Sequence, residues 1–134
     1  MSENNQDVTM GNQQGKTHFN IGWLIGMIEG EGCISLVRSA KSKNKYGHKI
    51  TPYLSITGTD KKLMDKAIEI IKFFNLPVYV DIRKYNNGRN WKDRYALRAS
   101  GLKSVKQWLE LIKPYLIGKL EQAEVVWKFI EQRE

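Results

Sequence analysis

The sequence predicts an α+β domain in which helices pack on one face of an antiparallel β-sheet. Two patterns carry this fold class. Apolar residues recur at helical spacing from Leu63 to Phe74, whereas Val78 to Tyr85 alternates apolar and polar side chains as a strand does. Asn86-Asn87-Gly88 then gives a strong hairpin signal, so the strands on either side of it are expected to be antiparallel neighbours.

The expected elements follow one another in the order α-β-β-α-β-β-α-α. Thr17 or Asn20 is expected to cap the first helix, and Thr59-Asp60 is expected to cap the second. The β-branched content after the first helix favours a strand there. The expected helices are residues 21–30, 59–74, 102–113 and 119–132, and the expected strands are residues 33–38, 50–57, 78–85 and 91–100.

The apolar faces of these elements predict the hydrophobic core. In the second strand and the second helix, the expected core residues are Ile50, Leu54, Ile56, Leu63, Ala67, Ile70, Ile71 and Phe74. In the last two helices they are Trp108, Leu109, Leu111, Val125, Trp127 and Ile130. Cys33 is interpreted as a packed thiol beside the sheet rather than a nucleophile, because no histidine is placed to act with it.

One folded domain is expected, because 134 residues suffice for one core and are too few for two. A hydrophobic fraction of 41% argues against general disorder. Residues 1–17 are polar, and we expect them to form a disordered segment before a single domain over residues 18–134. The apolar stretch from Trp23 to Ile28 is too short to span a bilayer, so no membrane partner is expected. The single cysteine fits a reducing, intracellular compartment.

The net charge of +8 suggests a polyanionic partner, because phosphate binding releases counterions. A merely soluble basic protein is the alternative on charge alone. The sheet face turned away from the helices is expected to bind DNA in the major groove, where base edges offer donors and acceptors. The alternative is a solvated face held by salt bridges. The residues expected on this outer face are Ser35, Tyr53, Ser55, Thr57, Tyr79, Asp81, Arg83, Tyr85, Lys92, Arg94 and Arg98.

Basic residues in two loops and at a strand end extend the expected DNA-binding surface. The loop from Lys41 to Lys49 and the turn from Asn86 to Lys92 would reach phosphates beyond the sheet, unless they are simply solvated loops. Trp91 is either a loop anchor or a base contact. The further DNA-binding residues expected are Arg38, Lys41, Lys43, Lys45 and Arg89.

A stripe of glycines on the first helix points to a partner helix. Gly22, Gly26 and Gly30 recur every fourth residue and therefore share one side of the helix. Each glycine costs roughly 1 kcal/mol relative to alanine, and close approach of a second helix would offset that cost. The sequence has no second helix of this kind, so a second copy of the chain is favoured. The residues expected at this dimer interface are Gly22, Trp23, Gly26, Met27, Glu29 and Gly30.

Two acids lie at the end of the same helix. Glu29 and Glu31 stand where the helix dipole and unpaired carbonyl groups disfavour negative charge. A divalent cation would reverse this effect, because carboxylate and carbonyl oxygens are its preferred ligands. Two chains packed through the glycine stripe would bring two such ends together. The alternative is a pair of surface glutamates near a turn.

The segment from Leu24 to Gly32 resembles the nine-residue signature of the LAGLIDADG homing endonucleases, with glutamates in place of both aspartates and Gly30 in place of the second alanine. Residues 56–61 resemble the family's strand-to-helix junction, and residues 112–123 resemble its C-terminal segment. The resemblance covers about residues 18–132. It implies the αββαββα fold with a saddle-shaped antiparallel sheet, here with an extra C-terminal helix. One copy of the motif implies a homodimer.

The resemblance also implies an activity, which is sequence-specific hydrolysis of double-stranded DNA at a long pseudo-palindromic site by an intron-encoded enzyme. Glu31 would bind the metal ion with help from the Gly30 carbonyl, and Lys119 would stand near the phosphate. Glu29 would shape the helix end and position its neighbours. Lys62 would be a further catalytic residue, the basic residue that follows the junction, with weaker alignment. Mg²⁺ is the expected cofactor, with Mn²⁺ able to replace it and Ca²⁺ supporting binding without cleavage. Gly58 departs from the family, which often carries a polar amide there. The alternatives are a non-cleaving intron RNA maturase or a transcription regulator.

Overall fold

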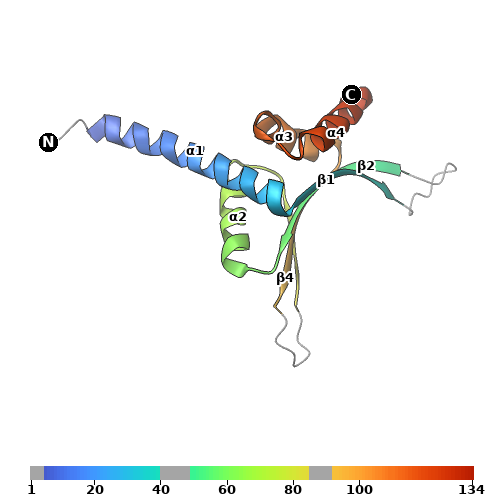
Figure 1. Cartoon of the computed structure of the whole chain (residues 1–134), viewed down its shortest axis with the longest axis horizontal. Helices are drawn as coiled ribbons and strands as arrows, with labels where there is room; N and C mark the ends of the chain where they lie inside the picture. The colour runs from blue at the N-terminus through green and yellow to red at the C-terminus, as the bar shows by residue number, and fades with distance from the viewer. Residues whose placement is uncertain (1–4, 40–48, 85–91) are drawn as a thin grey trace.

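The computed structural model describes residues 5–39, 49–84 and 92–134, with side chains from residue 14 onward except that of Ser39 (Figure 1). Its helices are α1 (Asn5–Glu31), α2 (Lys61–Phe73), α3 (Leu102–Ile112) and α4 (Leu120–Arg133), with a short 3₁₀ helix η1 (Lys113–Tyr115). Its strands are β1 (Gly32–Ser39), β2 (Lys49–Gly58), β3 (Tyr79–Arg83) and β4 (Arg94–Ser100). The expected residues Lys41, Lys43, Lys45, Tyr85, Arg89 and Trp91 lie outside the described residues.

The four strands form one antiparallel sheet in the order β1-β2-β4-β3. In Figure 1 the helices lie on one side of this sheet, and the β1–β2 end diverges from the β3–β4 end. The predicted α+β fold class and the order αββαββα with an additional C-terminal helix are therefore confirmed. None of the described helices combines the length and hydrophobicity that crossing a membrane requires.

Helix α1 begins at Asn5, whereas the capping residues predict a start near Ile21 and the polar composition predicts disorder over residues 1–17. No proline interrupts the segment from Asn5 to Glu31. Once a helix is anchored, each added turn costs little, because nucleation is the unfavourable step. Leu24 and Ile28 supply that anchor, since both are fully buried in the core.

The change from α1 to β1 takes place without a loop, and Gly32 makes this possible. A Cβ atom at this position would lie 2.6 Å from the Ile28 carbonyl oxygen, a distance that real Cβ atoms do not adopt. Any other residue at Gly32 would push the helix end away from the strand. The last turn of α1 and the first residue of β1 are consequently fixed relative to each other.

The core lies between the helices and the inner face of the sheet, and Trp108 is its largest buried side chain. The Trp108 indole Nε1 donates a hydrogen bond of 2.7 Å to the Pro77 carbonyl. The expected core places of Leu63, Val125 and Ile50 are wrong, because these side chains are 47%, 58% and 43% exposed. Met64 is buried one position after Leu63 in α2, while Ile50 lines an open hollow between β2 and α4, with Phe129 and Arg133.

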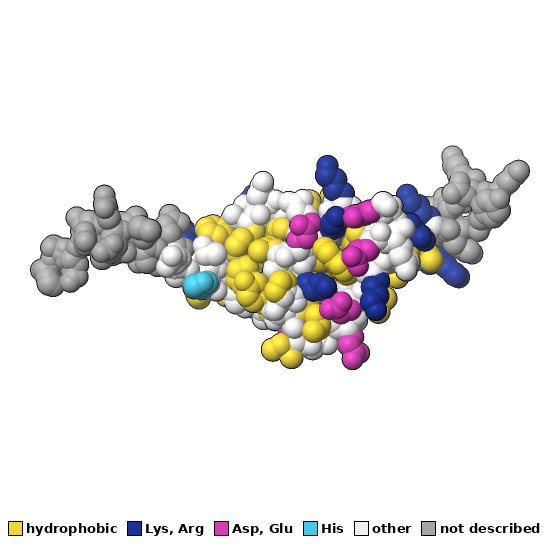
Figure 2. Space-filling view, turned by 90° about the horizontal axis from the view of Figure 1, so that it is seen from above, with side chains coloured by type: hydrophobic (Ala, Val, Ile, Leu, Met, Phe, Trp, Pro, Cys, Tyr) yellow, Lys and Arg dark blue, Asp and Glu magenta, His cyan; other side chains and the backbone are white. Residues whose placement is uncertain are grey.

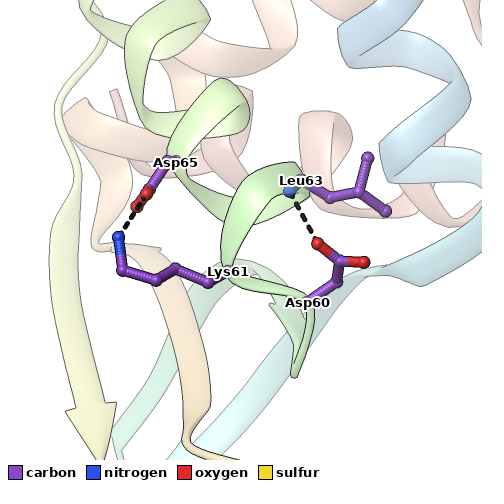
Figure 3. Close-up of polar contacts among 4 residues, drawn as sticks. All are labelled: Asp60, Lys61, Leu63 and Asp65. Carbon is purple, nitrogen blue, oxygen red and sulfur yellow. Dashed lines mark hydrogen bonds and ion pairs between the residues drawn. The ribbon is translucent and has the colours of Figure 1, made fainter.

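Helix α2 is held at its start as the sequence predicts. The Asp60 carboxylate accepts a hydrogen bond of 3.1 Å from the Leu63 backbone N–H, which satisfies one donor of the first turn (Figure 3). Lys61 and Asp65 form an exposed ion pair of 2.7 Å one turn apart. This cap fixes the junction between β2 and α2, at the open edge of the groove described below.

Candidate nucleic-acid interface and metal centre

The strand register places the expected recognition residues on one face of the sheet. Ser35 is opposite Tyr53, Ser55 is opposite Arg98, and Arg98 is in turn opposite Tyr79. Because residues directly opposite each other share a face and alternate residues return to it, one outer face is defined. This outer face carries Ser35, Tyr53, Ser55, Thr57, Tyr79, Asp81, Arg83, Arg94 and Arg98.

Two of the residues expected to bind DNA, Lys92 and Arg38, do not lie on the outer face. Lys92 precedes β4, which begins at Arg94 rather than at Trp91, so its place on the strand is wrong. Arg38 is opposite Ile50 in the register and alternates with Val37, which puts it on the inner side of the ribbon.

Cys33 is exposed and lies on the outer face opposite Ser55, so the expectation of a packed thiol is wrong. Its thiol lies 3.8 Å from the Ser35 hydroxyl.

The glycine stripe of α1 faces open space. Gly22, Gly26 and Gly30 are all exposed, and a Cβ atom at each position would meet nothing within 4 Å. Packing inside the chain therefore does not require these glycines. Trp23 and Met27 are half-buried beside the stripe. The interface that the stripe predicts is accordingly free in the single chain.

A groove of about 640 Å³ runs beside the stripe from α1 to the start of α2. Glu31 and Gly30 lie in its wall, and Glu31 is exposed. The groove also contains residues from β2, α2 and β4, so it joins the end of α1 to the outer face of the sheet. These further lining residues are Trp23, Gly26, Met27, Thr57, Gly58, Thr59, Asp60, Leu63, Met64 and Arg94.

Gly58 leaves the floor of this groove without a side chain. A Cβ atom here would lie 3.0 Å from the Met64 sulfur, which is tight but faces a flexible side chain. The departure from the family pattern at Gly58 therefore coincides with the close packing of Met64. No polar side chain is supplied to the groove at this position.

Glu29 is bound inside its own chain. Its Oε2 accepts hydrogen bonds from the backbone N–H groups of Ile117 at 2.8 Å and Gly118 at 2.7 Å, and its Oε1 accepts one from Lys119 at 2.8 Å. The hydrogen bond from Ile117 is the largest cause that lowers the pKa of Glu29, and partial desolvation opposes the shift. The carboxylate thus holds the turn before α4 against the end of α1.

Lys119 is brought to the end of α1 by the same contact. Its Nζ donates a hydrogen bond of 2.9 Å to the Glu29 backbone oxygen, beside the last carbonyl groups of the helix. The structure therefore gathers Glu31, Gly30 and Lys119 around one helix end. It does not add Lys62, which is exposed and lines a separate hollow with Lys92 and Asp93.

The oxygen atoms at this helix end suit a divalent cation. Within the described residues, no three His, Cys, Asp or Glu side chains form a ready metal cluster. Glu31 offers one carboxylate, Gly30 can add a carbonyl, and Asp60 lines the same groove. Mg²⁺ commonly binds through one or two carboxylates together with substrate phosphates, so this partial set fits such an ion.

The contact between Glu29 and the turn of Ile117 and Gly118 could not be found from the sequence. The bonded residues stand 88 and 89 positions apart, and no periodic pattern connects them. Arg94 was expected as a DNA-binding residue, and the structure adds that it lies in the groove of Glu31.

Comparison with known proteins relates this arrangement to one family. A family model described as LAGLIDADG endonuclease matches residues 24–128. A search of curated proteins gives no match.

Several solved structures share the fold. One is the homing endonuclease I-CvuI in complex with the I-CreI target in 2 mM Mg with its DNA not cleaved, at a TM-score of 0.68 and 22% identity, covering 87% of this chain and 68% of that chain. The homing endonuclease I-TnaI has a TM-score of 0.61 and 23% identity, covering 84% and 72% of the two chains. The archaeal intron-encoded homing endonuclease I-Vdi141I, complexed with DNA, has a TM-score of 0.64 and 17% identity, covering 85% and 68%. The family match spans most of the sequence and the fold agrees with it, so this chain belongs to the LAGLIDADG endonuclease family.

Proposed function

We propose that the chain acts as a homodimer that cuts double-stranded DNA at a specific, pseudo-palindromic site with divalent metal ions. The observation that carries the proposal is the gathering of Glu31, Gly30 and Lys119 at the end of a helix whose glycine stripe is open. Packing two α1 helices through the stripes would bring two such ends beside one axis. Each end could then serve one strand of the duplex.

The charge distribution supports DNA binding on the outer face of the sheet. Figure 2 views the molecule from the side of α3 and α4, where hydrophobic, basic and acidic side chains are mixed. On the outer face, Asp81 is the single acid among the described strand residues, beside Arg83, Arg94 and Arg98. A surface of this kind favours phosphates and base edges over a protein partner of mixed charge.

The residues of this chain would act on the phosphodiester in the following way. Glu31 and the Gly30 carbonyl would hold the divalent ion, which supplies Lewis acidity and neutralises charge on the phosphate. Lys119 would place a fixed positive charge near the phosphate, because Nζ keeps two further donors after binding the Glu29 carbonyl. Among the described residues, no histidine lines the groove, so deprotonation of water would rely on the ion or on solvent.

The test is cleavage of a randomised DNA library by the full chain in Mg²⁺, in Ca²⁺ and in EDTA. We expect site-specific cuts in Mg²⁺, a two-fold symmetric target, and binding alone in Ca²⁺, with Mn²⁺ able to replace Mg²⁺. Binding without cleavage in every metal would contradict the proposal. That result would favour a DNA-binding regulator or an intron RNA maturase of the same fold, which an assay of intron splicing would separate. The intracellular compartment stays a prediction.

A further inference from the structure

A small hollow lies on the outer face, across β2, β4 and β3. Its volume is about 130 Å³, and Ala96 stands in its floor as the smallest side chain of the neighbourhood. Three strands contribute the walls. The lining residues are Thr57, Asp81, Arg83, Arg94, Ala96 and Arg98, so three guanidinium groups and one carboxylate surround the hollow.

Two of these arginines form a cross-strand pair whose electrostatic repulsion destabilises the sheet. Arg83 and Arg94 are directly opposite in the register of β3 and β4. Like charges in this position destabilise a strand pair. Neither forms an ion pair with any residue in the described part of the chain, so the repulsion is not relieved there. An acceptor bound in the hollow would relieve it.

The third arginine is held in place. The Arg98 guanidinium Nη2 lies 3.7 Å from Asp81 Oδ2, and both side chains are about 40% exposed. The Arg98 Nε is buried without a hydrogen-bond partner, so that end of the group is turned into the sheet. Arg98 lines the hollow together with Asp81. Much of the rotamer freedom of Arg98 is therefore lost before any ligand binds, which lowers the entropic cost of binding.

We propose that Arg98 determines sequence specificity by reading a guanine in the major groove, and that Asp81 orients it. This inference rests on the proposed function, which lays the outer face in that groove. Guanine presents two adjacent acceptors, O6 and N7, which match the fork of an arginine. The Asp81 carboxylate offsets the charge of Arg98, so a neutral base that matches the arginine fork suits Arg98, whereas a phosphate would be attracted to Arg83 and Arg94, which have no carboxylate partner among the described residues.

The experiment selects bound sites from a randomised duplex library with the full chain in Ca²⁺. We expect a guanine at one symmetric pair of positions in the wild-type sites. Arg98→Ala should reduce the preference for guanine at those positions by roughly 10-fold or more and leave the other positions unchanged. Arg98→Lys, which keeps the charge and removes the fork, should lose the preference in the same way. Asp81→Asn should reduce it in part.

The control variant is Arg133→Ala, which removes an equal charge on α4, where Arg133 lies 4.5 Å from the Phe129 ring. It should leave every base preference intact, and all variants should keep the wild-type circular dichroism. Uniformly weaker binding to all sequences by Arg98→Ala, with Arg98→Lys unaffected, would mean a phosphate contact and overturn the assignment. A guanine preference that survives Arg98→Ala would overturn it too. Selection of no site by the wild-type chain would instead overturn the proposed function.

Discussion

Glu29 and Lys119 are joined by two hydrogen bonds that run in the same direction through different groups of the lysine. The Lys119 backbone N–H donates to the Glu29 carboxylate at 2.8 Å, and its Nζ donates to the Glu29 backbone oxygen at 2.9 Å. The end of α1 and the start of α4 are thus locked together. Glu31 follows Glu29 by two residues. The same two hydrogen bonds therefore position both the proposed metal ligand, Glu31, and the proposed phosphate-binding group, Lys119.

Replacing Glu29 should weaken the contact between the end of α1 and the start of α4. Glu29→Ala removes the acceptor of three backbone N–H groups, and we expect a lower denaturation midpoint together with slower DNA cleavage at saturating protein. Glu29→Gln keeps one acceptor oxygen, so its denaturation midpoint and cleavage rate should lie between those of the wild type and of Glu29→Ala. Thermal melting and single-turnover cleavage would measure these effects. Glu131→Gln, an exposed acid near the end of α4, is the control and should change neither.

Removing the groups at the helix end should reduce cleavage and spare binding. We expect Glu31→Gln and Lys119→Met each to lower the single-turnover rate by about 100-fold or more, because each removes charge stabilisation near the phosphate. Affinity for the target in Ca²⁺, measured by gel shift or fluorescence anisotropy, should change far less for Lys119→Met. Full activity of Glu31→Gln at an unchanged Mg²⁺ requirement would show that the metal ligand has been assigned wrongly.

The glycine stripe allows stability and assembly to be separated. In Gly26→Ala the new methyl group meets nothing inside the chain, and helix propensity should favour the folded monomer by up to about 1 kcal/mol. Gly26→Ile adds more bulk to the same open surface. We expect both variants to weaken the dimer, Gly26→Ile more strongly, in sedimentation at a series of concentrations. A wild-type chain that sediments as a monomer at every concentration would rule out the interface.

The N-cap of α2 makes a prediction that does not depend on function. Asp60→Ala should destabilise the fold by about 1 kcal/mol, since it removes the acceptor for the Leu63 N–H. Asp60→Asn should retain most of that stability, because asparagine caps helices about as well. Urea denaturation followed by circular dichroism would measure the difference. Equal midpoints for Asp60→Ala and the wild type would mean that the cap contributes nothing.

Much of the fold and the outer face could be predicted, because both follow from local periodicity. The alternation in β3 and β4 placed Asp81, Arg83 and Arg98 on one side, and the cap at Asp60 placed α2. Local patterns could not decide between Leu63 and Met64, since either can face inward after a small rotation of the helix.

Contacts between distant segments could not be predicted. The bonds from Glu29 to the turn before α4 depend on how two separate helices meet in space. The same is true of Lys62, whose sequence position follows the junction but whose side chain lines a different hollow from that of Glu31. The shortening of β4 removed Lys92 from the sheet, because strand ends are decided by the pairing of their neighbours.

The loopless joint at Gly32 has a consequence for how such a protein would measure DNA. In the proposed dimer, α1 would pack against its partner helix and β1 would lie on the duplex, and no flexible loop separates α1 from β1. A few degrees of change in the crossing angle of the two helices would rotate each sheet, as a rigid body, relative to the other. The separation of the two half-sites would then be set by helix crossing, and an inserted base pair at the centre of the target would be rejected even where every base contact remained available.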